Sequence, residues 1–229
     1  MRASAETASL AAEAYNVVRQ RIARGELVLG QAVSRRHLAA ELGMSFLPVT
    51  EAMQRLEFEG LLESRPRAGT RVRIPSQQDV EGNYVVRKAL ETQAAILFSQ
   101  VATAAERSEL RRLAARVDAL SMKSDRSMYV TLHLKLHQRI AECARCDALS
   151  EVIERTHAMA MIWFCVMSKP SPDSPRRHQH LVDEILSGDE MRISTAVREH
   201  LAVGKRHTVE VLGPYFKTNS LRFSRTRSA

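Results

Sequence analysis

Four histidines in the second half of the chain have the residue type and spacing of a metal site. His133 and His137 are four residues apart, and His178 and His200 follow at longer intervals. On a helix, side chains four residues apart project from one face, so the first two imidazoles would point the same way. Imidazole nitrogens that converge from several helices can bind a divalent metal ion. We therefore expect these four histidines to form one metal site.

A set of four imidazoles suits Zn²⁺, Ni²⁺ or Cu²⁺ better than Mg²⁺ or Ca²⁺. We expect Zn²⁺ first, with Ni²⁺ as the alternative. Such a site has three interpretations: a sensing site whose metal accepts a further ligand, a closed structural site, or an enzyme centre that activates water. The histidine pair stands in the sequence HLKLH and lacks the glutamate of an H-E-x-x-H motif, which argues against the enzyme.

The composition is that of a globular protein. Hydrophobic residues make up 45% of the 229 residues, and glycine and proline together are few. Three cysteines do not indicate a disulfide framework, so we expect a reducing, cytoplasmic location. The N-terminus does not read as a secretory signal, and no apolar run approaches the ~18 residues of a membrane span.

Positive charge is concentrated at the two ends of the chain. The net charge is +8; residues 1–75 hold 11 basic and 8 acidic residues, and residues 213–229 hold four basic residues and no acidic one. The middle of the chain is therefore nearly neutral. An anionic partner such as DNA would bind at the basic regions.

The first 75 residues follow the order of a winged helix-turn-helix. Ser34 and Ser45 are expected to cap the second and third helices, and the third helix buries Val49, Met53 and Leu56. The basic segment after this helix alternates as a hairpin of two strands. We expect helices over 10–24, 35–42 and 46–58, and strands over 62–65 and 70–74.

The rest of the chain is predicted to be a bundle of about six helices, so the fold class is mostly α. Pro214 follows a glycine and is expected to end the last helix. This divides the chain into a DNA-binding domain (1–75), an all-helical effector and metal-binding domain (76–212) and a basic, disordered tail (213–229). The six helices are expected over 80–102, 104–122, 125–144, 147–167, 174–187 and 190–212.

In a winged helix-turn-helix, one helix enters the major groove of DNA and the wing contacts the phosphates. Four arginines lie within the short hairpin, and alternation with Val72 and Ile74 predicts that Arg71 and Arg73 point outward. The candidate DNA-binding residues lie on the two helices and the wing: Arg36, Ser45, Phe46, Leu47, Thr50, Gln54, Arg65, Arg67 and Arg71.

Residues 33–62 resemble the winged helix-turn-helix of the GntR family of bacterial transcription regulators, through Leu38-Ala39, Leu42-Gly43, Pro48-Val49 and Glu59-Gly60-Leu61. The second half resembles the helical FCD effector domain of the family's FadR-like branch. The matching positions are Arg87, Glu91, His137, Asp147-Ala148-Leu149, His178, Gly188-Asp189 and His200.

The resemblance implies a regulator that responds to a ligand and is not an enzyme. It implies that a small organic acid completes the coordination of the metal. Arg87 is a candidate to bind the carboxylate of that effector, although a salt bridge to Glu91, one helical turn away, is equally consistent with the sequence. We further expect a homodimer that reads a short palindromic operator of double-stranded DNA.

The chain departs from the family pattern at two places. The family begins its recognition helix with Ser-Arg-Thr-Pro-Val-Arg, whereas residues 45–50 read SFLPVT. Each lost bidentate arginine–guanine pair removes about 1–3 kcal/mol of discrimination, while Phe46 and Leu47 can contact thymine methyl groups. The second departure is His133, where the family commonly places aspartate. The metal site would then carry one negative charge fewer.

Overall fold

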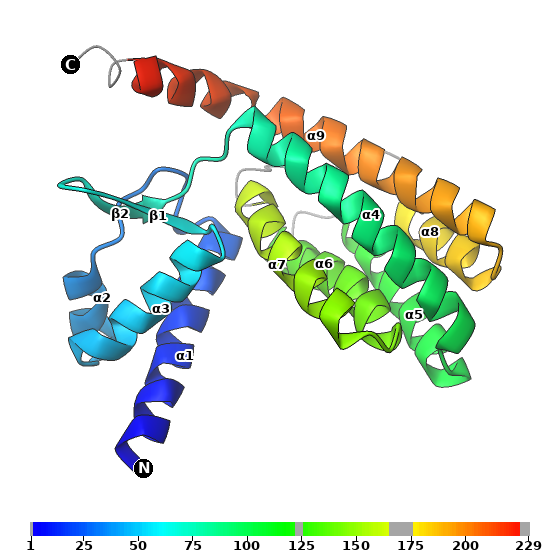
Figure 1. The fold of residues 1–229 in the computed structure, drawn as a ribbon, viewed down its shortest axis with the longest axis horizontal. Helices are drawn as coiled ribbons and strands as arrows, with labels where there is room; N and C mark the ends of the chain where they lie inside the picture. Colours follow the sequence, from blue (N-terminus) through cyan, green and yellow to red (C-terminus); the bar gives the residue numbers. More distant parts are fainter. Residues whose placement is uncertain (1, 122–125, 165–175, 225–229) are drawn as a thin grey trace. The chain divides into compact units, whose positions relative to one another are not determined.

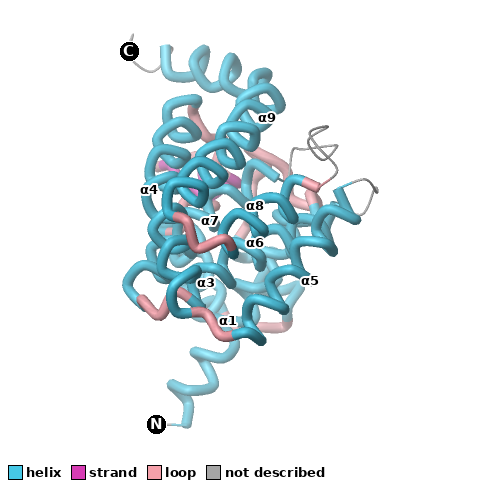
Figure 2. Tube along the Cα trace, turned by 90° about the vertical axis from the view of Figure 1, so that its right-hand side faces the viewer, coloured by secondary structure: helices cyan, strands magenta, loops and turns pink. Residues whose placement is uncertain are grey.

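A computed structural model describes residues 2–121, 126–164 and 176–224 (Figure 1). The chain forms two compact units. The first extends to Ile74 and includes the last turns of helix α7 (Asp147–Phe164) from residue 158, and the second begins at Pro75. Most of the chain is helical, as predicted (Figure 2). In the part of the chain that the structure describes, every helix is too short or too polar to cross a membrane.

The first unit is a winged helix-turn-helix. Its helix α1 packs on α3, which also contacts α2 and the first strand. The two strands pair antiparallel with Leu62 opposite Val72, and both of these side chains are buried. The buried face of α3 is formed by Val49, Met53 and Leu56, as predicted. The elements are α1 (Arg2–Arg24), α2 (Arg35–Leu42), α3 (Phe46–Phe58), β1 (Leu62–Arg65) and β2 (Gly69–Val72).

Two local predictions for this unit are corrected. The first helix begins at Arg2 and not near residue 10, because the added segment is rich in alanine, the strongest helix former. Ser34 caps α2 by accepting a hydrogen bond from the backbone N–H of His37, as expected. Ser45 occupies the corresponding position before α3, but its side chain makes no capping hydrogen bond.

The second unit is a helical bundle. Helix α4 lies along α9, and α5 packs against both α6 and α8 (Figure 1). Within the described residues this unit has six helices, the predicted number. The predicted helix boundaries at 122, 125, 167 and 174 lie outside those residues. The helices are α4 (Gln77–Val101), α5 (Ala104–Ser121), α6 (Arg126–Cys143), α7, α8 (Arg177–Leu186) and α9 (Glu190–Ser224).

The predicted end of the last helix is wrong. Helix α9 continues through Pro214 to Ser224, so most of the segment expected to be a disordered tail is helical. A proline removes one backbone hydrogen bond and disfavours a helix interior, but the turns on both sides retain their own bonds. Residues 225–229 lie outside the described part of the chain.

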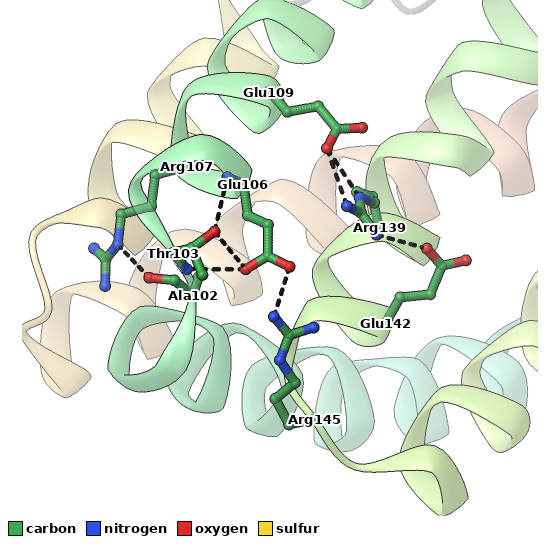
Figure 3. A network of polar contacts seen from close by, with 8 residues as sticks. All are labelled: Ala102, Thr103, Glu106, Arg107, Glu109, Arg139, Glu142 and Arg145. Atoms are coloured by element: carbon green, nitrogen blue, oxygen red, sulfur yellow. Dashed lines mark hydrogen bonds and ion pairs between the residues drawn. The ribbon is translucent and has the colours of Figure 1, made fainter.

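A polar network joins α5 to α6 (Figure 3). Thr103 and Glu106 exchange hydrogen bonds at the start of α5 in a capping box. Glu106 also pairs with Arg145 at 2.7 Å, and Arg139 on α6 pairs with Glu109 on α5 at 3.0 Å. These contacts fix the helix that carries Asp118 against the helix that carries His133 and His137.

Candidate metal centre and nucleic-acid interface

The structure brings all four predicted histidines together inside the second unit. His133 and His137 come from α6, His178 from α8 and His200 from α9, and each side chain is buried. The centroids of neighbouring rings lie 4.7 to 5.1 Å apart. Helices α6, α8 and α9 therefore direct imidazoles into one buried space, as their spacing in the sequence predicted.

Ring nitrogens of these histidines face one another at distances that suit a shared metal ion. His133 Nδ1 is 3.0 Å from His178 Nε2, and His137 Nε2 is 3.3 Å from His200 Nε2. Two nitrogens bound to one tetrahedral zinc at 2.0–2.1 Å are about 3.3 Å apart. Each of these two pairs of nitrogens therefore has the chemistry and the separation of two ligands on one transition metal ion.

Three of the four candidate ligands are tightly grouped. Candidate ligand atoms of His133, His137 and His178 all lie within 4.8 Å of one another. His200 adjoins this group through His137, but its ring centroid is 6.3 Å from that of His133. Coordination by all four would require His200 to shift slightly toward His133.

Two buried carboxylates orient the ligand rings. Asp118 accepts a hydrogen bond from His178 Nδ1 at 2.6 Å, and Glu91 accepts one from His137 Nδ1 at 2.8 Å. With the proton held at Nδ1, the Nε2 lone pair of each ring points to the centre of the cluster. Carboxylates of this kind fix the tautomer and raise the basicity of metal-binding histidines.

The histidines are neutral at physiological pH. Burial lowers the pKa values of His133 and His200 well below their ordinary range, and for His133 the charges of neighbouring histidines add to this effect. Burial also lowers the pKa of His178 to about 4, although its hydrogen bond to Asp118 opposes the change. Neutral imidazoles can bind a metal without first releasing a proton.

Arg87 is paired with Glu91. Its Nε donates to Glu91 Oε1 at 2.6 Å, and both side chains are buried. His157 Nε2 lies 3.2 Å from the same oxygen. Burial alone would raise the pKa of Glu91, but the charge of Arg87 and the hydrogen bonds from His137 and His157 outweigh burial and hold this pKa well below its ordinary range. The salt bridge between Arg87 and Glu91, one of the two roles predicted for Arg87, is therefore present.

A small cavity adjoins the cluster. Glu91, His137 and His200 form its polar side, and the rest of its wall is aliphatic, from Ala94, Ala95, Ile140, Ile153, Leu181, Ile185 and Val197. The space open to the centre of a water molecule is about 10 Å³, which is room for about one water. A ligand of several heavy atoms would enter only if the surrounding helices moved apart.

The first unit exposes two large apolar side chains at the start of α3. Phe46 and Leu47 are 57% and 60% exposed, which is unusual for large hydrophobic side chains. Gln54 is also exposed, whereas the hydroxyl of Thr50 donates to the carbonyl of Phe46 within the helix. Arg36 on α2 is exposed as well. The predicted DNA-reading residues at the start of α3 are therefore accessible or partly accessible, and their contact with bases stays a prediction.

The wing is less basic than its sequence suggests. Arg71 was expected to point outward, but it is only partly exposed and pairs with Glu63 across the hairpin at 2.5 Å. Arg65 lies 3.6 Å from the same carboxylate. Arg67, at the turn of the hairpin, is exposed and has a positive φ of 60°. Of the wing arginines proposed to meet DNA, Arg67 is therefore the most accessible.

Asp118 is absent from the predicted site, and Glu91 and His157 were not expected in the centre. Their positions carried a signal: each lies on the buried stripe of its helix, where a charged or polar group needs a partner. Asp118 follows Val117 on the apolar face of α5, and His157 lies one turn after Ile153. Which helices supply those partners depends on the packing of the bundle.

The fold is a winged helix-turn-helix joined to a helical unit with a polar centre. This combination is typical of bacterial transcription regulators that have a DNA-binding domain and a second, helical domain. Comparison with family models agrees. The model described as "Bacterial regulatory proteins, gntR family" matches residues 10–72, and the FCD domain model matches residues 83–203. The chain belongs to the GntR family of regulators that carry an FCD domain, and it is a DNA-binding transcription regulator and not an enzyme.

Curated relatives cover nearly the same length. The chain is 28% identical over 196 residues to "Probable D-xylose utilization operon transcriptional repressor" of Paenarthrobacter nicotinovorans, covering 85% of this chain and 86% of that protein. It is 23% identical to the transcriptional repressor RspR of Escherichia coli, covering 92% of each. The solved structure of E. coli McbR/YncC is similar in fold, with a TM-score of 0.73, 19% identity and coverage of 90% and 98%.

Proposed function

We propose that this regulator is a homodimer whose helical domain, residues 76–212, binds a divalent transition metal and a small organic acid. His133, His137, His178 and His200 would hold the metal, with Zn²⁺ expected first and Ni²⁺ as the alternative. The observation that carries the proposal is the set of buried, neutral imidazoles whose ring nitrogens face one another at 3.0 and 3.3 Å. The metal would supply a Lewis-acidic centre that accepts an anion.

The charge balance of the centre supports an anionic ligand. Glu91 and Asp118 contribute two negative charges, while Arg87 and Arg177 contribute two positive charges nearby. The histidines are neutral, so a divalent metal would leave the centre with a net positive charge. A carboxylate would offset that charge in a space where burial strengthens electrostatic attraction.

The first unit, residues 1–75, would read the operator through α3 and its wing. Phe46 and Leu47 would contact thymine methyl groups in the major groove, beside Ser45, Thr50 and Gln54. Arg36, Arg65, Arg67 and Arg71 would contact the phosphates. An effector would act by shifting the population of dimers in which both reading helices fit the DNA.

Operator affinity measured with and without metal tests this function. A DNA site selected from a random library would be titrated with the full chain by fluorescence anisotropy, once with Zn²⁺ and once after chelation. We expect metal and a bound carboxylate to change the affinity, and His137→Ala to abolish the change. Equal affinity under all conditions, with a folded protein, would exclude a sensing role.

The size of the cavity favours a second candidate, a closed structural metal site. The cavity beside the cluster, as the described residues line it, has room for about one water and not for an effector of several heavy atoms. A structural site contributes its binding energy to folding, so metal removal should unfold the helical domain. A sensing site should keep its helices after chelation and lose only the response to a ligand. Circular dichroism before and after chelation separates the two.

A further inference from the structure

Arg177 is the unexplained charged residue beside the candidate metal centre. It is the first residue of α8 and directly precedes His178. Its Nη1 atom is buried and has no hydrogen-bond partner in the described part of the chain. A buried guanidinium N–H without an acceptor is unfavourable. An arginine kept in this state indicates a position that an anion would complete.

The guanidinium of Arg177 lies near the histidine cluster. It forms a side-chain hydrogen bond with Tyr129 of α6. The ring of Tyr129 has its centroid 5.5 Å from that of His133 and 6.4 Å from that of His178. Arg177 and Tyr129 thus border the cluster where α6 meets α8.

Several positive contributions meet at this border. The N-terminus of α8 carries a partial positive charge, Arg177 adds a full charge, and a metal held by the histidines would add two more. Asp118 offsets part of this by accepting hydrogen bonds from the backbone N–H groups of His178 and Gln179, at 3.1 and 2.9 Å. An additional anion would therefore be attracted here.

The family resemblance predicts that Arg87 binds the effector, but Arg87 already forms an ion pair with Glu91. Its Nε donates to Glu91, and the pair is almost fully buried. An incoming carboxylate would have to break this ion pair and leave Glu91 beside a second negative charge. Arg177 needs no such exchange, because its Nη1 donates to nothing in the described residues.

We propose that Arg177, and not Arg87, is the anion anchor of the metal centre and receives the carboxylate of a small organic acid bound at the metal. Arg87 instead holds Glu91 in position for His137. The proposal rests on the proposed metal-binding function. It assigns a role to a residue outside the predicted set of ligands.

The test uses the full chain loaded with Co²⁺, whose visible spectrum reports changes at the metal, and sodium acetate as the probe. Sodium chloride at equal ionic strength is the salt control. Arg177→Gln removes the positive charge and the paired N–H donors of the guanidinium, and Arg177→Lys keeps only the charge. Arg176→Gln is the matched control, because Arg176 is the exposed neighbour of Arg177. Metal content of each variant is measured before the titration.

We expect acetate to change the spectrum of the wild type and of the Arg176 variant with equal affinity. Arg177→Gln should retain the metal and weaken acetate binding about ten-fold or more, as for the loss of a hydrogen bond to a charged group; Arg177→Lys should lie between. Equal acetate affinity in all variants, or no response of the metal-loaded wild type, would overturn the anchor. Loss of metal from both Arg177 variants would also count against it, because Arg177 would then support the metal and not the anion. A wild type that binds no metal would instead refute the proposed function.

Discussion

Glu91 should be the most sensitive single residue of the helical domain. Its carboxylate lies 2.6 Å from Arg87, 2.8 Å from His137 and 3.2 Å from His157, in a site where its own side chain is 8% exposed. Glu91→Gln keeps the shape of the side chain and removes the charge. It leaves the Arg87 guanidinium buried without a counter-ion.

The expected cost is about 3–5 kcal/mol of unfolding free energy, the usual result of breaking a buried ion pair by removing one partner. Loss of the carboxylate that orients His137 should also weaken metal binding about 10- to 100-fold. The stability is measured by urea denaturation in the presence of a chelator, followed by circular dichroism. The metal affinity is measured by competition with a coloured chelator.

Glu109→Gln is the matched control. Glu109 pairs with Arg139 at 3.0 Å, but both side chains are partly exposed, at 39% and 28%, so its loss should cost under about 1 kcal/mol. The double variant Arg87→Met with Glu91→Gln removes both buried charges and should be more stable than Glu91→Gln alone. The reasoning is refuted if Glu91→Gln costs no more than the control and leaves the metal affinity unchanged.

Three further predictions concern pH and DNA. Metal-free protein should lose stability as the pH falls from about 6.5 to about 4, since burial lowers the pKa of His178 to about 4 and the unfolded chain takes up its proton first. The unfolding free energy lost over this range is on the order of 3 kcal/mol for this residue. Urea denaturation at pH 7 and pH 5 should show a smaller loss in His178→Asn than in the wild type. An equal loss in both proteins would contradict the assignment to His178. Arg67→Ala should lower the slope of log affinity for operator DNA against log salt by about 0.9, as expected for one phosphate contact, and Arg71→Ala by less because of its pair with Glu63; the opposite order would mean that Arg71 leaves Glu63 to bind phosphate. Replacing thymine by uracil in a selected operator should weaken binding by the wild type but not by the double variant Phe46→Ala, Leu47→Ala, and equal weakening of both proteins would place the methyl contacts elsewhere.

Local patterns in the sequence predicted the fold well. The helix over 46–58 and its buried face were correct because apolar periodicity and nearby caps act over a few residues. The predicted end of the last helix is wrong because a glycine–proline pair usually favours a stop, whereas Pro214 lies within a helix that continues to Ser224. A proline that disfavours helix locally can therefore lie inside a long helix that continues on both sides of it.

The candidate centre was predicted in part. The spacing of His133 and His137 placed two imidazoles on one face of α6, and the structure places His178 and His200 beside them. The partners Asp118, Glu91 and His157 come from three other helices, and the contacts Asp118–His178, Glu91–His137 and Glu91–His157 join residues 46 to 66 positions apart. Such contacts depend on how the helices pack, which no local pattern determines.

The wing arginines were also predicted only in part. The alternation of apolar residues predicts which face of the strand Arg71 lies on. Its pairing with Glu63 depends on the register of the hairpin, in which these two residues are directly opposite. Opposite charges across an antiparallel pair attract one another. Their pairing reduces the charge available to DNA and leaves Arg67, at the turn, as the accessible cation.

The central claim, a metal centre built from four buried histidines, is tested most directly by the metal content of the purified chain. Wild type and the double variant His133→Ala, His137→Ala would be incubated with Zn²⁺, desalted and analysed for metal per chain. The account predicts about one ion per chain in the wild type and almost none in the variant. A wild type that retains neither Zn²⁺ nor Ni²⁺ would contradict it and reduce the histidines to packing residues.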